Sequence, residues 1–111
     1  MPTPDLEISA EELQRKLAAG DPVYLLDVRA GWEHDRARIA DGPIVPMQEL
    51  PQRLAEIQPP QGAEFVCYCH HGMRSRQAAS FLRQVGFPQA RSLAGGIDRW
   101  STAIDPRVQR Y

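Results

Sequence analysis

The stretch that decides the fold runs from residue 65 to residue 75: Phe65-Val66-Cys67-Tyr68-Cys69-His70-His71-Gly72-Met73-Arg74-Ser75. Its first five residues are apolar and β-prone, and a helical pattern begins at Arg76, which predicts a strand, a short loop and a helix. The backbone N–H groups of such a loop and of the first helical turn have no partner within the helix. They form a nest for an anion, and the nearest anion is the thiolate of Cys69. We therefore interpret Cys69 as an activated nucleophile.

The predicted active-site loop consists of the six residues that follow this cysteine: His70, His71, Gly72, Met73, Arg74 and Ser75. Gly72 allows a backbone conformation or a close approach that other residues do not. Arg74 is either a bidentate partner for an oxyanion or a brace for the loop through a carboxylate, and the sequence leaves both roles open. The two histidines are expected at the mouth of the pocket.

Other interpretations of the cysteines and histidines are weaker. A buried structural role for Cys69 would not require a polar loop with a flanking Arg74. Cys67 should point to the same face of the sheet, and we interpret it as a small core residue, with a resolving thiol as the alternative. Four adjacent cysteine and histidine ligands make a poor tetrahedral zinc site, and the one other histidine is His34. The sequence therefore predicts neither a metal nor a cofactor.

The composition is that of an ordinary soluble globular protein, with 111 residues, 42% hydrophobic and 24% charged residues and a net charge of −1. This length predicts one domain over residues 1–111, with a core at about 6–104 and a short tail at 105–111. The charge predicts no nucleic-acid or anionic-membrane partner. The sequence has no run long enough to span a membrane and no signal-peptide pattern at its start, so we expect a cytoplasmic protein.

Strand and helix patterns alternate along the chain. Strands are expected at 6–8, 23–28, 44–46, 64–69 and 90–93, and helical segments at 10–19, 29–38, 47–57, 76–85 and 96–100. This alternation predicts an α/β fold with one parallel sheet covered on both faces. In such sheets ligands lie beyond the carboxyl ends of the strands, where Asp27 and Cys69 both fall. Asp27 and Arg29 could form an exposed ion pair, but their position favours a role in supporting the catalytic loop.

Three segments, taken in order, resemble the motifs of the single-domain rhodanese sulfurtransferases: Leu26-Asp27-Val28-Arg29 with Trp32-Glu33, then residues 69–75, then Leu93-Ala94-Gly95-Gly96-Ile97-Asp98-Arg99-Trp100. The resemblance covers nearly the whole chain. It departs at 37–43, where Arg38 replaces the family's common histidine and a reshaped turn is expected. The family implies a three-layer α/β/α fold with a five-stranded parallel sheet and a persulfide at Cys69.

The same resemblance implies a sulfurtransferase that moves a sulfane sulfur from thiosulfate or a related small anion to cyanide or a thiol, with a protein sulfur acceptor as a further expectation. A cysteine phosphatase or arsenate reductase is the rival enzyme class. Related phosphatases place the arginine six positions after the cysteine, whereas Arg74 is five positions after Cys69. The shorter loop favours a single sulfur over a tetrahedral phosphate. A non-catalytic binding module would not need to retain the cysteine, Gly72 and Arg74 together.

Overall fold

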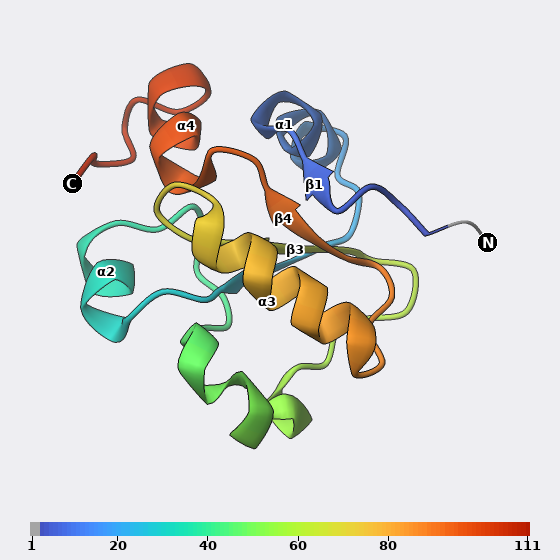
Figure 1. Ribbon diagram of the computed structural model, residues 1–111. Coiled ribbons are helices and arrows are strands. Elements are labelled where there is room, and N and C mark those ends of the chain that lie inside the picture. The colour runs from blue at the N-terminus through green and yellow to red at the C-terminus, as the bar shows by residue number, and fades with distance from the viewer. Residues whose placement is uncertain (1–2) are drawn as a thin grey trace.

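Four parallel strands form the centre of the computed structural model, which describes residues 3–111 (Figure 1). They are β1 (Glu7–Ile8), β2 (Val23–Asp27), β3 (Glu64–Tyr68) and β4 (Ala90–Leu93). Their order across the sheet is β1-β4-β3-β2, and every neighbouring pair is parallel. The predicted α/β architecture is confirmed. Because all strands run the same way, the ends of β2 and β3 meet at one edge, where Asp27 pairs with Tyr68.

The predicted fifth strand at 44–46 is wrong within the described residues. The segment makes one isolated parallel bridge, from Ile44 to Asp27. Pro43 and Pro46 flank this bridge, and a proline has no N–H with which to extend a ladder. The segment still runs beside the end of β2, since Val45 N–H donates to the carbonyl of Asp27 at 2.9 Å.

Helices cover both faces of the sheet. One face carries α1 (Ala10–Ala18) and α4 (Gly96–Ala103), whose buried residues share a core with Val66 and Tyr68 of β3. The other face carries α3 (Met73–Gln84) and two short 3-10 helices, η1 (Met47–Gln52) and η2 (Leu54–Glu56). Figure 1 shows α3 crossing the sheet with η1 and η2 below it, and α1 and α4 above. The six-residue helix α2 (Gly31–Arg36) follows β2.

Several helical boundaries differ from expectation. Helix α2 is shorter than the expected segment 29–38, α4 continues to Ala103, and the segments 47–57 and 76–85 differ as follows. The helical spacing over 47–57 forms η1 and η2 rather than one helix, because Pro51 inside the segment removes a helical N–H. Helix α3 begins at Met73 instead of Arg76. The earlier start shortens the free loop to residues 69–72 and brings the first helical turn directly against Cys69.

The two core clusters explain why alternate residues of β3 differ in their partners. Phe65 and Cys67 pack toward α3, whereas Val66 and Tyr68 pack toward α1 and α4. All four are at most 2% exposed, as expected for a strand buried on both faces. Burying a large apolar side chain contributes about 1.5–3 kcal/mol, so this central strand holds the end that carries Cys69 rigidly. Within residues 3–111, no helix is long and apolar enough to cross a membrane.

Candidate active site

Cys69 lies directly after β3, with its side chain 1% exposed. Its Sγ accepts hydrogen bonds from the backbone N–H of Gly72 at 3.0 Å and of Ser75 at 3.3 Å. Gly72 makes this turn with a φ of +107°, in the left-handed region that favours glycine. The N-terminus of α3 adds the positive end of its dipole to these donors. The arrangement therefore stabilises negative charge on this sulfur atom.

Ser75 adds a hydroxyl to the surroundings of the sulfur. Its Oγ lies 3.4 Å from Cys69 Sγ and 2.7 Å from the hydroxyl of Ser92 in β4. Both serines are fully buried. In the thiol form the cysteine donates to Ser75, and in the thiolate form the hydroxyl can turn and donate to sulfur. The sequence does not predict Ser92 as a site residue, although a small polar side chain inside the expected strand 90–93 is a usable signal.

The start of α4 packs against the backbone of the active-site loop. The N–H groups of Ile97 and Asp98 donate to the carbonyls of Cys69 and His70 at 2.9 and 3.0 Å. Gly96 permits this approach, because a Cβ atom there would collide with both carbonyl oxygens. The Gly-Gly motif before α4 thus fixes the loop from the side opposite α3.

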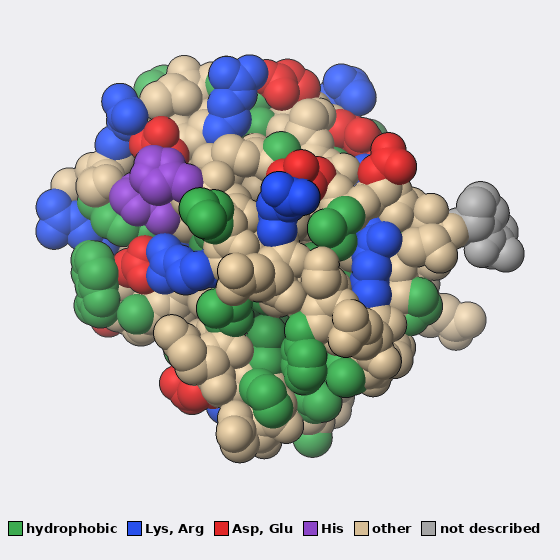
Figure 2. Space-filling view, in the orientation of Figure 1, with side chains coloured by type: hydrophobic (Ala, Val, Ile, Leu, Met, Phe, Trp, Pro, Cys, Tyr) green, Lys and Arg blue, Asp and Glu red, His purple; other side chains and the backbone are tan. Residues whose placement is uncertain are grey.

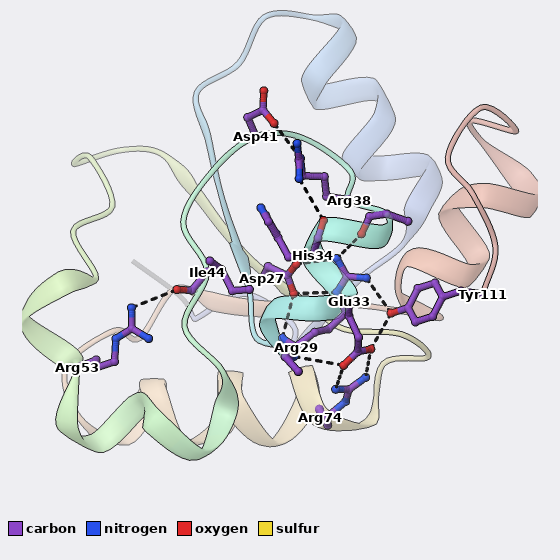
Figure 3. Close-up of polar contacts among 12 residues, drawn as sticks. Asp27, Arg29, Glu33, His34, Arg38, Asp41, Ile44, Arg53, Arg74 and Tyr111 are labelled. Carbon is purple, nitrogen blue, oxygen red and sulfur yellow. Dashed lines mark hydrogen bonds and ion pairs between the residues drawn. The ribbon is translucent and has the colours of Figure 1, made fainter.

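Arg74 forms a bidentate ion pair with Glu33 of α2, with its Nη1 and Nη2 at 2.7 and 2.9 Å from the two carboxylate oxygens (Figure 3). Glu33 is only 4% exposed. Hydrogen bonds from Arg74, and a further one from Tyr111, hold the pKa of Glu33 at about 2 despite its burial. Of the two roles that the sequence leaves open for Arg74, this geometry favours the brace.

We expect the Arg74–Glu33 pair to stabilise the protein above about pH 4.5 and to lose this effect as the pH falls toward 2. The pKa of Glu33 lies at about 2 in the folded chain against an ordinary 4.5, so the unfolded chain takes up the proton first. The linked stabilisation at neutral pH is roughly 3 kcal/mol. Urea unfolding of wild type and Glu33→Gln should therefore show a difference in free energy of unfolding that shrinks between pH 5 and pH 2.5.

Glu56→Gln is the matched control, because Glu56 pairs with Arg53 at an exposed position. Its free energy of unfolding should differ little from wild type at any pH. A Glu33→Gln difference that stays constant from pH 7 to pH 2.5 would contradict the role of this carboxylate.

Asp27 and Arg29 form a fully buried ion pair rather than an exposed one. Arg29 Nε and Nη2 donate to the two oxygens of Asp27 at 2.9 and 2.6 Å, and His34 Nδ1 lies 2.8 Å from Asp27. Nη2 also donates to the carbonyl of Ala37, and Nη1 donates to the hydroxyl of Tyr111 at 2.7 Å. The Asp27–Arg29 pair stabilises the segment that follows β2. Tyr111 links this pair to Glu33, which in turn contacts Arg74 of the active-site loop.

A pocket of about 400 Å³ opens beside the cysteine and is lined by Cys69, His70, His71, Met73, Arg74 and Gln77. The rings of His70 and His71 stack at 4.0 Å, and histidine side chains gather at one place on the face shown in Figure 2. Burial, and then the neighbouring His71, lower the pKa of His70. Met73 is 75% exposed at the rim. The pocket is large enough for a small anion but open to larger acceptors.

Cys67 lies in the core that it shares with Cys69 and is fully buried. Burial raises the pKa of its thiol, with the charge of Cys69 as a second cause. These surroundings favour the interpretation as a small core residue. Among the described residues 3–111, no group of three or more His, Cys, Asp and Glu side chains is placed to hold a metal ion.

Comparison with known proteins identifies the family to which this chain belongs. The profile of the Rhodanese-like domain matches residues 9–103, which is most of the chain. The chain belongs to the rhodanese-like family. A sulfurtransferase of Allochromatium vinosum is 38% identical over 95 residues, which are 86% of this chain and 87% of that protein. A putative sulfurtransferase of Bacillus subtilis, YtwF, is 29% identical over 91% of this chain and 95% of its own length.

Solved structures of rhodanese-like proteins agree with this assignment. The human single-domain sulfurtransferase TSTD1 superposes with a TM-score of 0.75 at 28% identity, covering 90% of this chain and 98% of that one. A rhodanese-related protein of Thermoplasma volcanium has a TM-score of 0.79 at 28% identity over 96% of this chain and all of its own. Longer relatives match over a part only: the chain spans 23% of an adenylyltransferase and sulfurtransferase of Zea mays.

Proposed function

We propose that this rhodanese-like protein is a sulfurtransferase that moves a sulfane sulfur from thiosulfate or a related donor to cyanide or a thiol, through a persulfide on Cys69. The observation that carries the proposal is the pair of backbone N–H groups, from Gly72 and Ser75, directed at Cys69 Sγ. The sulfurtransferase relatives support the same class of reaction.

The reaction proceeds in two half-steps. The Cys69 thiolate attacks the outer sulfur of the donor, an S–S bond forms, and the donor's own S–S bond breaks so that sulfite leaves with the electron pair. The acceptor then attacks the terminal sulfur of the persulfide, and the thiolate is released again. The two N–H donors face a sulfur that carries negative charge at the beginning and the end of the cycle. The electrons balance within these steps without an added cofactor.

Donor recognition rests on the loop backbone rather than on a free guanidinium. Arg74 already pairs with Glu33 through two hydrogen bonds, and we assign it to holding α3 and α2 together around the pocket. The N–H groups at the start of α3 remain as the principal anion-binding feature. His70 and His71 line one part of the pocket, the histidine wall, and Met73 and Gln77 line it as well.

A protein thiol or sulfur carrier is a further acceptor that we propose. A putative sulfur carrier protein of Bacillus subtilis, YrkF, is 30% identical over 86% of this chain, which spans half of that protein. The opening at the rim, with the exposed Met73, leaves room for a thiol presented by a larger molecule. Small thiols and protein thiols would use the same persulfide.

Steady-state kinetics with thiosulfate and cyanide test the proposal against the phosphatase alternative. We expect ping-pong kinetics, with parallel double-reciprocal lines, and no measurable hydrolysis of an aryl phosphate at the same enzyme concentration. The reason is the tight cradle, in which Arg74 contacts a carboxylate and the donors converge on one sulfur atom. Phosphate ester hydrolysis faster than sulfur transfer would show that the protein is a phosphatase rather than a sulfurtransferase.

A further inference from the structure

Tyr111 brings the end of the sequence back to the active-site loop. The chain leaves α4 at Ala103, and Ser101 Oγ then holds the returning segment by donating to the carbonyl of Val108 at 2.8 Å. Val108 and Tyr111 pack against the core beneath α1 and α4. The tail is therefore a docked part of the domain, and its final side chain lies between two elements of the site.

The Tyr111 hydroxyl bridges the two ion pairs described above. It accepts a hydrogen bond from Arg29 Nη1 at 2.7 Å and donates one to Glu33 Oε2 at 2.7 Å (Figure 3). The same Oε2 atom also accepts from Arg74 Nη2. Burial raises the pKa of Tyr111 to about 12, so the hydroxyl keeps the proton that it donates to Glu33. A continuous chain of charge-assisted hydrogen bonds thus runs from Asp27 to Arg74.

The Tyr111 ring makes a second, independent contact. It stacks on His70 with centroids 4.1 Å apart and planes 9° from parallel, while His70 in turn stacks on His71. Trp32 of α2 packs edge-on against Tyr111 at 6.1 Å. Stacked rings at these distances favour one orientation of the histidine wall of the pocket.

We propose that Tyr111 is a positioning residue of the sulfur-transfer site, whose hydroxyl orients Glu33 for Arg74 and whose ring holds His70 against the pocket. The proposal rests on the proposed function for its effect on turnover. The contacts themselves can be tested without that function. Loss of the hydroxyl removes a partner from the buried guanidinium of Arg29 and a donor from Glu33, which loosens the pairing that holds the start of α3.

Two variants separate the contacts. Tyr111→Phe keeps the ring over His70 and removes the hydroxyl, whereas Tyr111→Ala removes both. Tyr24→Phe is the matched control, because the Tyr24 hydroxyl accepts a hydrogen bond from Gln58 N–H outside the site. Each protein is assayed for sulfur transfer, for the rate of Cys69 alkylation by iodoacetamide, for the melting temperature, and for the NMR titration of His70.

We expect Tyr111→Phe to lower kcat/KM for thiosulfate by about tenfold and to slow alkylation severalfold, because misplaced loop donors weaken charge stabilisation on sulfur. Its His70 titration should match wild type. Tyr111→Ala should uncover His70 and raise its pKa, with His71, Asp98 and Glu33 as the remaining groups that face it. Tyr24→Phe should resemble wild type in turnover, alkylation and titration.

A wild-type protein that transfers no sulfur would refute the proposed function, while alkylation and the His70 titration would still decide the role of Tyr111. Alkylation rates equal to wild type in both Tyr111 variants, together with an unchanged His70 titration, would overturn the positioning role. The positioning role would also be overturned if Tyr111→Phe and Tyr24→Phe lost turnover to the same extent, in proportion to their loss of melting temperature. The loss of turnover would then reflect reduced stability alone.

Discussion

Cys69→Ser is expected to reduce thiosulfate-dependent sulfur transfer by roughly a thousandfold or more, to the background rate, because serine cannot form the persulfide. Cys67→Ser should retain most of the activity. Both cysteines are at most 1% exposed, but only Cys69 receives the N–H groups of Gly72 and Ser75. The measurement is the initial rate of thiocyanate formation from thiosulfate and cyanide.

The paired substitutions control for one another, since both replace a buried thiol in the same core cluster by a hydroxyl. A folded Cys69→Ser protein, verified by circular dichroism, isolates the chemistry from the fold. Substantial turnover in that variant would show that Cys69 is not the nucleophile. A Cys67→Ser variant that is folded but inactive would indicate that Cys67 is the nucleophile instead.

Arg29→Met should destabilise the protein by about 3–5 kcal/mol, a large effect for a single side chain. Asp27 and Arg29 are both fully buried, and the substitution leaves the Asp27 carboxylate in the core without its two guanidinium donors. The double variant Asp27→Leu/Arg29→Met removes both charges and should lose less than the single variant. Urea unfolding at pH 7 measures the free energy of unfolding of each.

Arg53→Met provides the comparison near the surface, because Arg53 is 32% exposed and pairs with the exposed Glu49 and Glu56. Its free energy of unfolding should fall by less than about 1 kcal/mol. Equal losses of the free energy of unfolding for Arg29→Met and Arg53→Met would show that the buried Asp27–Arg29 pair is no more important for stability than a surface ion pair.

Local sequence patterns predict those parts of the fold that depend on hydrophobic periodicity and on the parallel direction of the strands. The expected strand 90–93 has the same bounds as β4, and the parallel sheet explains why Asp27 and Cys69 lie at the same edge. The patterns failed where a proline competes with periodicity, at Pro51 in η1 and around the bridge at Ile44. The expected start of the helix at Arg76 is three residues later than the observed start of α3, because the apolar spacing of Ala78, Leu82 and Val85 does not extend back to residues 73–75.

The partners of the site residues depended on contacts that no local pattern encodes. Arg74 meets Glu33 across 41 positions of sequence, so the carboxylate that pairs with it could not be named from the loop alone. The Trp-Glu pair in the first motif was nevertheless a signal that Glu33 belonged to the site. Tyr111 contacts Arg29 across 82 positions from a tail that resembled a simple extension. Long-range packing of this kind becomes visible only once the chain has folded.

The most direct test of the central claim is mass spectrometry of the protein after incubation with thiosulfate and removal of small molecules. We expect the intact mass to rise by one sulfur atom, peptide mapping to place this sulfur on Cys69, and cyanide or a thiol to remove it with return of the original mass. An unchanged mass in a folded protein, or an added sulfur that maps to Cys67, would rule out a persulfide on Cys69.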